Sequence, residues 1–303
     1  MSDLILVGGE ALFDLVPNGD GLAGHPGGGP FNTARTIGRL ERPVAYLGRL
    51  SSDRFGRRLE GLLAEDGVRL DSVVRTDDPT TLALVEVDRD GVARYRFYER
   101  GTSASGLTVE DALAALPPAV GMLHVGTLGL ALEPVASALE AVVERVTDRA
   151  VVAVDPNVRP WVIADPAAYR ARLGRVLARS DVVKVSEEDL AWLEPDRPPV
   201  DAVRRLLEHG PAVGLVTRGP SGAVVVTRTA DVAVPAPRAT VVDTIGAGDA
   251  FGGGFLAWWS ERGLGRDELG ELDFVVEAAR FACVVAARTC SKPGATPPYR
   301  SEL

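Results

Sequence analysis

The sequence is poor in lysine and histidine, and it has no long apolar run. Only Lys184 and Lys292 among its 33 basic residues are lysines, and there are three histidines. Neither lysine lies in a Gly-x-x-x-x-Gly-Lys or Val-Ala-Ile-Lys context, which excludes a Walker-type phosphate loop and a protein kinase. The histidines lack the spacing of metal ligands. No run approaches the roughly 18 apolar residues of a membrane span.

Cysteine and net positive charge are also lacking. Cys283 and Cys290 are too few for a disulfide framework or a zinc site, and we expect them to be buried small residues of one helix. The N-terminal segment lacks the basic start and cleavage site of a signal peptide, which predicts a cytoplasmic protein. The 33 basic and 42 acidic residues give a net charge of −9, so sequence-independent binding to nucleic acid is excluded.

Short apolar runs alternate with amphipathic stretches along residues 1–303. This alternation predicts one α/β domain with a doubly wound, mostly parallel sheet. The predicted strands are residues 4–7, 44–47, 122–125, 151–154, 182–185 and 213–217, and the predicted helices are residues 30–40, 53–66, 133–146, 167–178 and 200–210.

One region breaks the alternation. Residues 80–87 and 92–98 have the period of exposed strands and are joined by a turn at Asp88–Gly91. Residues 9–16 have the pattern of a third such strand. We therefore expect a small antiparallel sheet, built from about 9–16 and 80–100, that stands outside the main domain and covers a site.

A tight loop opens into an apolar helix at residues 243–249, Asp-Thr-Ile-Gly-Ala-Gly-Asp. The first N–H groups of a helix lack intrahelical partners, so this loop predicts an anion site made of backbone. A carboxylate repels phosphate, but Asp249 has a use there if it accepts a proton from a hydroxyl that attacks the phosphate. The structural alternative is that Asp249 only caps the helix.

A second glycine cluster, Gly27-Gly28-Gly29, precedes Pro30 and Asn32 at another predicted helix start. An uncharged polar ligand fits this cluster, because the Asn32 amide both donates and accepts hydrogen bonds. Residues 19–24 match the dinucleotide pattern Gly-x-Gly-x-x-Gly, but no helix follows them, so we interpret them as a plain loop.

Two segments, GGGPFNTARTIGRL and DTIGAGDAFGGGF, resemble the signature segments of the ribokinase-like carbohydrate kinases, the PfkB family. The resemblance extends over nearly the whole chain. GEALFDLVP, FYERGTSAS, DPNVRPWVI and VKVSEEDLAWL are most similar to bacterial fructokinases. The resemblance implies a Rossmann-like, ribokinase-like α/β fold in which the small sheet is a β-lid.

The resemblance assigns roles to individual residues. It implies that Asp249 is the catalytic base and that the N–H groups of Gly246, Ala247 and Gly248 hold the γ-phosphate. The residues implied to bind the sugar are Asp14, Gly28, Gly29, Asn32, Phe97, Arg100 and Arg159. The residues implied to contact ATP are Lys184, Ser186, Thr217, Gly219, Gly222 and Gly248.

Metal ions and assembly also follow from the resemblance. Mg²⁺ is expected to arrive with ATP, bound mainly through phosphates and water. Many relatives have Asn-x-x-Glu where this chain has Ser186 and Asp189, so the shorter side chains leave open how Asp189 contributes to the Mg²⁺ site. Asp243 and the Ile245 carbonyl are candidates for a monovalent cation such as K⁺, and the family often forms homodimers through the lid.

The sequence therefore predicts an ATP-dependent sugar kinase, with fructose the expected substrate and fructose 6-phosphate the product. Within the same class, a 2-keto-3-deoxygluconate kinase stays open, because Arg159 fits a substrate carboxylate as well as a neutral sugar. Another sugar or nucleoside kinase is a further alternative. A nicotinamide-dependent oxidoreductase shares the alternating architecture but is disfavoured by the misplaced dinucleotide pattern, and a sugar-binding regulator is disfavoured by the intact 243–249 loop.

Overall fold

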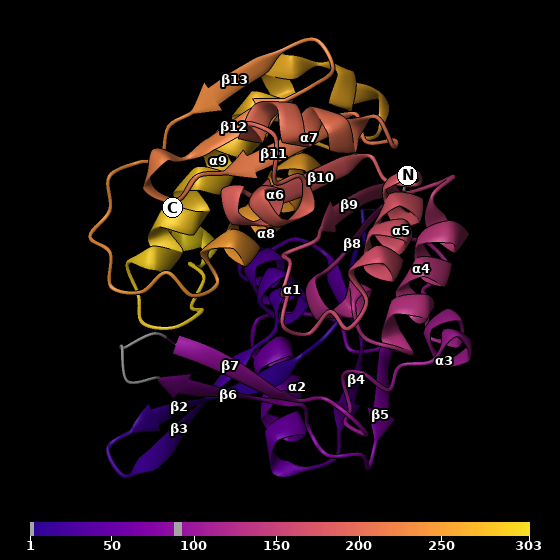
Figure 1. Ribbon diagram of the computed structural model, residues 1–303, viewed down its shortest axis with the longest axis vertical. Coiled ribbons are helices and arrows are strands. Elements are labelled where there is room, and N and C mark those ends of the chain that lie inside the picture. The colour runs from indigo at the N-terminus through magenta and orange to yellow at the C-terminus, as the bar shows by residue number, and fades with distance from the viewer. Residues whose placement is uncertain (1–2, 88–92) are drawn as a thin grey trace.

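The main body of the protein is a sheet of nine strands, seen in a computed structural model that describes residues 3–87 and 93–303 (Figure 1). Seven neighbouring strands run parallel, and β12 and β13 add an antiparallel edge. In spatial order the strands are β13 (Asp231–Val234), β12 (Ala223–Val226), β11 (Val213–Thr217), β10 (Val182–Ser186), β9 (Val151–Asp155), β8 (Met122–Gly126), β1 (Ile5–Gly8), β4 (Val44–Ser51) and β5 (Val73–Thr76).

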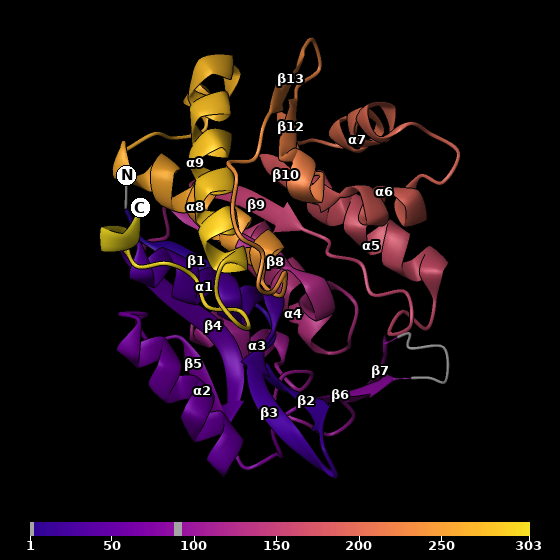
Figure 2. The same ribbon diagram turned by 90° about the vertical axis from the view of Figure 1, so that its left-hand side faces the viewer.

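Helices cover both faces of this sheet, as Figure 2 shows. One face carries α1 (Gly29–Arg39), α2 (Arg54–Glu65), α8 (Ala247–Glu261) and α9 (Leu272–Cys290). The other carries α3 (Val109–Ala114), α4 (Val135–Val146), α5 (Pro166–Leu177), α6 (Glu187–Leu193) and α7 (Pro199–Leu207). The predicted doubly wound, mostly parallel architecture is confirmed.

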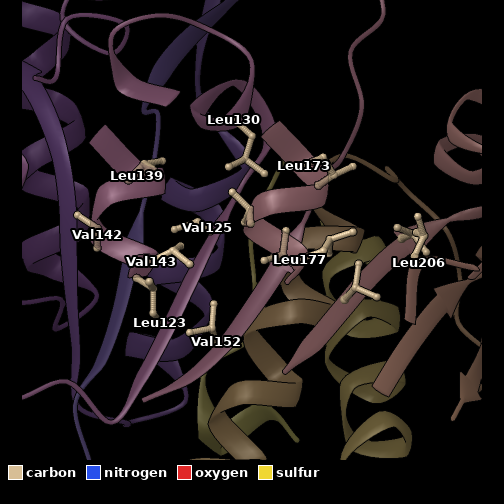
Figure 3. Close-up of a cluster of buried hydrophobic side chains, with 14 of the residues drawn as sticks. Leu123, Val125, Leu130, Leu139, Val142, Val143, Val152, Leu173, Leu177 and Leu206 are labelled. Carbon is tan, nitrogen blue, oxygen red and sulfur yellow. The ribbon is translucent and has the colours of Figure 1, made fainter. Parts of the chain in front are cut away.

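Because helices cover both faces of the sheet, its strands are apolar on both sides. Successive side chains of a strand point to opposite faces, so Leu4 and Leu6 belong to one buried cluster, while Ile5 and Val7 belong to the other. Figure 3 shows the first cluster where β8 and β9 meet α4, with Leu123, Val125, Val152, Leu139, Val142 and Val143 among its labelled members.

A second sheet of four strands projects below the first in Figure 1, and we call it the small sheet. Its order is β3 (Gly21–Gly27), β2 (Leu12–Asn18), β6 (Leu82–Val87) and β7 (Ala93–Tyr98). The pairs β2–β3 and β6–β7 are antiparallel, and β2 lies parallel to β6. The predicted turn at Asp88–Gly91 and residue 92 lie outside the described residues.

The small sheet corrects two predictions. Residues 19–24 are not a plain loop, because Gly21–Gly24 begin β3, which pairs with β2 along its whole length. The strand predicted from residues 9–16 begins only at Leu12. Glycine and proline give Gly21–Gly27 little intrinsic strand preference, so the hydrogen bonds of β2 impose this strand, and a sequence pattern does not reveal it.

The remaining predictions at this level concern cysteines and membrane spans. Both cysteines are unpaired and lie on α9, where Cys283 is buried and Cys290 is half-buried at the last residue of the helix. Within residues 3–87 and 93–303, no helix combines the length and apolarity needed to cross a membrane.

Candidate active site

A cleft of about 620 Å³ lies at the carboxyl ends of the parallel strands. The chain builds the sheet outward from β1 in both directions, with β4 on one side and β8 on the other. The loops that leave β1 and β8 therefore diverge, and such a switch point is where open α/β sheets bind ligands. The cleft is walled by the loops after β1, β8, β9, β10 and β11 and by the first residues of α1 and α8.

Most of the predicted site residues meet in this cleft. It is lined by Asp14, Gly28, Gly29, Asn32, Phe97, Arg159, Lys184, Ser186, Asp189, Thr217, Ile245, Gly246, Gly248 and Asp249. These residues come from segments up to 235 positions apart in the chain (249 − 14 = 235). Their roles remain predictions, but their convergence is a property of the fold.

The loop of residues 243–248 turns sharply into α8. Gly246 precedes the helix with φ 76°, a left-handed conformation that favours glycine, and a Cβ there would lie 2.7 Å from the Cβ of Ala295. The Ala247 N–H donates to the Thr244 carbonyl at 3.2 Å, and Ala247 does not line the cleft. Gly246, Gly248 and Asp249 do line it, so the start of α8 brings the positive end of a helix dipole to the cleft.

Asp249 lies in the first turn of α8 and is 9% exposed. Its Oδ2 accepts a hydrogen bond of 2.9 Å from Asn32 Nδ2. Burial raises the pKa of Asp249, while the Asn32 hydrogen bond and the charges of Lys184 and Arg159 act in the opposite direction. A carboxylate held this way is oriented by one oxygen and presents the other for accepting a proton.

The second glycine cluster faces Asp249 across the cleft. A Cβ on Gly29 would lie 2.5 Å from Thr127 Oγ1 and 3.3 Å from Asp249 Oδ1, so only glycine leaves this space open. Asn32 lies one turn further into α1, where its Oδ1 is buried without a partner among the described residues. The arrangement leaves a small polar space between α1 and α8.

The small sheet contributes Asp14 and Phe97 to the same cleft. Asp14 lies on β2, opposite His25 of β3. Burial raises the pKa of Asp14 to about 6, and the charges of His25 and Arg159 limit the rise. Arg159 follows β9, and its guanidinium donates to the carbonyls of Asn157 and Val158 at 3.0 and 3.1 Å.

Lys184 is buried rather than extended into solvent. Its Nζ donates to Asp155 Oδ2 at 2.8 Å, with both side chains less than a tenth exposed. The two residues lie side by side on the parallel strands β10 and β9. Burial alone would lower the pKa of Lys184, but the charges of Asp155 and Asp189 outweigh it and raise the pKa. A Cβ on Gly248 would lie 2.9 Å from Nζ, so a permanent cation adjoins the start of α8.

Ser186 and Asp189 form a capping box at the start of α6. The Ser186 hydroxyl accepts from the Asp189 N–H, while Asp189 Oδ2 accepts from the Ser186 N–H at 2.8 Å. Asp189 Oδ1 accepts from the Val158 N–H at 2.7 Å. Both carboxylate oxygens therefore already have protein partners, and Asp189 joins α6 to the loop after β9.

Asp243 organises the loop ahead of α8. One carboxylate oxygen accepts from the Ile245 N–H at 3.0 Å, and the other accepts from the Gly294 N–H at 2.9 Å. Asp243 thereby ties residues 243–245 to the segment after α9. It does not line the cleft, whereas Ile245 does.

Five predicted residues do not line the cleft: Asp243 and Ala247 lie beside lining residues near the start of α8, and Arg100, Gly219 and Gly222 lie further away. The Arg100 side chain is 98% exposed and borders a second cavity of about 1090 Å³ on the other side of Phe97. Gly219 and Gly222 form the turn between β11 and β12, beyond Thr217 at the end of β11. The reason is geometric: the strand ends at Thr217 and Tyr98, and the residues after them turn away from the cleft.

Sequence reasoning missed four residues of this region. Glu10, Thr127 and Asn157 line the cleft, and Asp155 holds Lys184. Each follows or ends a predicted parallel strand, and polar residues at that edge face the ligand crevice of an α/β sheet. A polar residue at the end of a predicted parallel strand could therefore have indicated the cleft. It could not have indicated which of these residues is buried.

Comparison with known proteins agrees with this geometry. The model of the pfkB family carbohydrate kinases matches residues 3–302, so the chain belongs to that family. A fructokinase of Rhizobium leguminosarum bv. trifolii is 38% identical over 84% of this chain and 79% of its own. A fructokinase of Klebsiella pneumoniae is 35% identical over 100% of this chain and 99% of its own.

Solved structures show the same fold. A fructokinase from Xylella fastidiosa with bound ATP superposes with a TM-score of 0.87 at 30% identity, covering 97% of this chain and 94% of that one. A double mutant of a Vibrio cholerae fructokinase, with fructose, ADP and potassium ion bound, has a TM-score of 0.84 at 27% identity and covers 96% and 93% of the two chains. The predicted family and ribokinase-like fold are confirmed.

Proposed function

We propose that this protein is an ATP-dependent fructokinase that transfers the γ-phosphate of ATP to a primary hydroxyl of fructose. The observation that carries the proposal is the position of Asp249, a buried carboxylate beside the backbone anion site of α8. Asn32 holds one of its oxygens, and Gly29 leaves space in front of the other. Fructokinases among the relatives, two of them with ATP or with fructose and ADP bound, support the choice of substrates.

In the proposed mechanism, Asp249 accepts the proton of the sugar hydroxyl as that oxygen attacks the γ-phosphorus in line with the leaving group. Negative charge that develops on the transferred phosphoryl oxygens is stabilised by the N–H groups at the start of α8 and by the Lys184 ammonium. Asp155 keeps Lys184 at that position. The sugar lies between Asp14, Asn32 and Gly29, where it meets both charged and backbone polar groups.

The described residues fit a magnesium ion that is delivered by the nucleotide. Asp189 lines the cleft, so its carboxylate would hold Mg²⁺ directly or through one of the waters that this ion keeps. Mg²⁺ would neutralise phosphate charge when bound. For K⁺, the Asp243 carboxylate and the Ile245 carbonyl are hard oxygen donors at the loop ahead of α8, which is the chemistry a monovalent cation requires.

A homodimer through the small sheet is part of the proposal. The sheet stands apart from the main body, and β3 forms one edge with Leu22 56% exposed. An exposed strand edge pairs readily with a second copy. Sedimentation equilibrium tests this assembly, because a dimer has twice the 32.0 kDa of one chain, whereas a stable monomer contradicts the dimer.

The variant Asp249→Asn tests the catalytic proposal. Asn keeps an acceptor for Asn32 but cannot take a proton, so we expect kcat to fall by about two to four orders of magnitude, with fructose binding retained. ADP release in the presence of fructose measures kcat, and calorimetry measures binding. The matched control is Asp267→Asn, which removes an exposed carboxylate remote from the cleft. Turnover of Asp249→Asn near the wild-type value contradicts the assignment.

A further inference from the structure

Glu10 is a buried carboxyl group that the mechanism above does not use. It is the second residue after β1, it is 2% exposed, and it lines the cleft. Glutamate is seldom buried this far without a specific partner, because removing its charge from water is costly. Its contacts therefore indicate why a carboxyl group is placed there.

The two oxygens of Glu10 bind two different loops. Oε1 accepts a hydrogen bond of 3.1 Å from the Gly29 N–H, and Oε2 accepts one of 3.1 Å from the Gly129 N–H. Gly29 is the first residue of α1, and Gly129 lies in the turn that follows β8. The two backbone donors are 100 residues apart in sequence (129 − 29 = 100), and one side chain joins them.

These two loops form the sugar side of the cleft. A Cβ on Gly29 would approach Thr127 Oγ1 to 2.5 Å, so the loops are already in close contact there. Thr127 also accepts a hydrogen bond of 3.2 Å from Asn157 Nδ2, which extends the same wall to the loop after β9. The distance between Gly29 and the turn after β8 therefore sets the width of the space in front of Asp249.

The groups around Glu10 shift the pKa of its carboxyl group. Burial raises the pKa of Glu10 to about 8, the N–H groups of Gly129 and Gly29 lower it, and the charge of Asp249 raises it. A carboxyl group with so large a desolvation cost is a poor device for stability alone. Both oxygens of this carboxyl group do accept a backbone hydrogen bond, one from each loop.

We propose that Glu10 is a positioning residue for the sugar: its carboxyl group bridges the start of α1 and the turn after β8, and so fixes the sugar pocket in front of Asp249. This inference rests on the proposed function of the cleft. It predicts that loss of the bridge affects the sugar more than the nucleotide, because Lys184 lies on β10 and Thr217 ends β11, whereas the Glu10 carboxyl joins the start of α1 to the turn after β8.

Two variants break the bridge in different ways. Glu10→Gln offers one acceptor and one donor, so one glycine N–H loses its partner, and Glu10→Asp is one methylene too short to reach both. For each we expect KM for fructose to rise about tenfold, equivalent to about 1.4 kcal/mol, and kcat to fall, with KM for ATP changed less than twofold. The matched control is Glu144→Gln, the same substitution on the outer surface of α4.

A purely structural role gives a different result: KM for both substrates rises together, or neither changes while the melting temperature falls. Either outcome overturns the proposal. If the variants do not fold, hydrogen exchange of the wild-type amides decides the question. We expect the Gly29 and Gly129 N–H groups to exchange slowly and at similar rates, and rapid exchange of either one overturns the bridge. Because exchange needs no substrate, it separates failure of this inference from failure of the proposed fructokinase activity.

Discussion

Asp14 and Asp249 acquire their properties from burial rather than from their sequence neighbours. Each carboxylate lies in the cleft wall, where loss of water favours the neutral acid and raises the pKa. The positive charges that oppose this shift come from other elements, namely His25 and Arg159 for Asp14, and Lys184 and Arg159 for Asp249. An acid that must accept a proton therefore functions only above its raised pKa.

This shift gives a pH dependence for sugar binding. Asp14 has a pKa of about 6 in the folded protein, so it is ionised above that pH and accepts hydrogen bonds from sugar hydroxyls there. We expect KM for fructose to rise about tenfold for each pH unit below 6, as the carboxylate is lost. Steady-state kinetics from pH 5 to 8 measures this rise.

The variant Asp14→Asn distinguishes a pH dependence of KM that is caused by Asp14 from one that is caused by Asp249. The variant should show a raised KM that no longer depends on Asp14 protonation, and a higher free energy of unfolding at pH 7. The sign follows from linkage: a raised pKa means that ionisation of Asp14 costs stability as pH rises, and Asn removes that cost. Asp20→Asn, in the exposed turn between β2 and β3, is the control. A KM for fructose that stays flat between pH 5 and 8 in the wild type argues against this role.

At the residue scale, sequence reasoning found the residues that motifs carry and missed those that only the fold brings together. Asp249, Gly29 and Asn32 lie in two continuous segments that open helices, so local chemistry predicts them. Glu10 and Asp155 act through partners on other strands. Arg100 is placed outside the cleft because a side chain after the last residue of a strand can turn either way.

Helix α8 packs closely against α1 and α9, because glycines stand at the two positions, Gly253 and Gly254, where it faces them. A Cβ on Gly253 would lie 2.8 Å from the Cβ of Thr36, and one on Gly254 would lie 3.1 Å from the Cβ of Val285. This approach brings Asn32 of α1 to Asp249 of α8. The apolar stretch after Asp249 thus positions the proposed base as well as forming the core.

Gly253→Ala and Gly252→Ala form a matched pair for this packing. The methyl group at 253 has no room, so we expect a loss of about 1–3 kcal/mol in the free energy of unfolding. At 252 the nearest atom is His124 Cε1 at 3.9 Å, so alanine fits and its better helix propensity adds about 0.5–1 kcal/mol. Urea unfolding compares the two variants. Equal effects at both positions contradict the close contact of α1 and α8.

The larger elements were predictable from the sequence, and the small sheet only in part. Residues 53–66 and 167–178 have a clear helical period, and the bounds of α2 and α5 differ from these ranges by one residue at each end. β3 was not predictable, because its glycines, His25 and Pro26 have no strand pattern and its partner β2 supplies the order. Pairing between segments, rather than local preference, decides such strands.

At the scale of the whole molecule, the protein is acidic and binds an acidic nucleotide according to the proposal. The net charge of −9 repels phosphates at long range, where salt screens it. In the cleft, the start of α8, Lys184 and Arg159 bring positive charge close to Asp14, Asp189 and Asp249. The scarcity of lysine fits the proposed phosphate site, which uses one buried lysine held by Asp155 together with backbone amides.

The choice between a neutral sugar and a sugar acid as substrate depends on the whole cleft. Arg159 suits a carboxylate as well as a neutral sugar, and its Nη1 donates to two carbonyls of its own loop. These two bonds do not use Nε or Nη2, so the position of Arg159 fits both kinds of substrate and the choice between them is decided by experiment.

The most direct test measures kcat/KM for fructose and for 2-keto-3-deoxygluconate in parallel, by ADP release with saturating ATP and Mg²⁺. The account predicts that fructose is phosphorylated to fructose 6-phosphate, with a kcat/KM at least about tenfold above that of the acid, equivalent to about 1.4 kcal/mol in transition-state binding. Phosphorylation of the acid alone, or of neither compound, contradicts it.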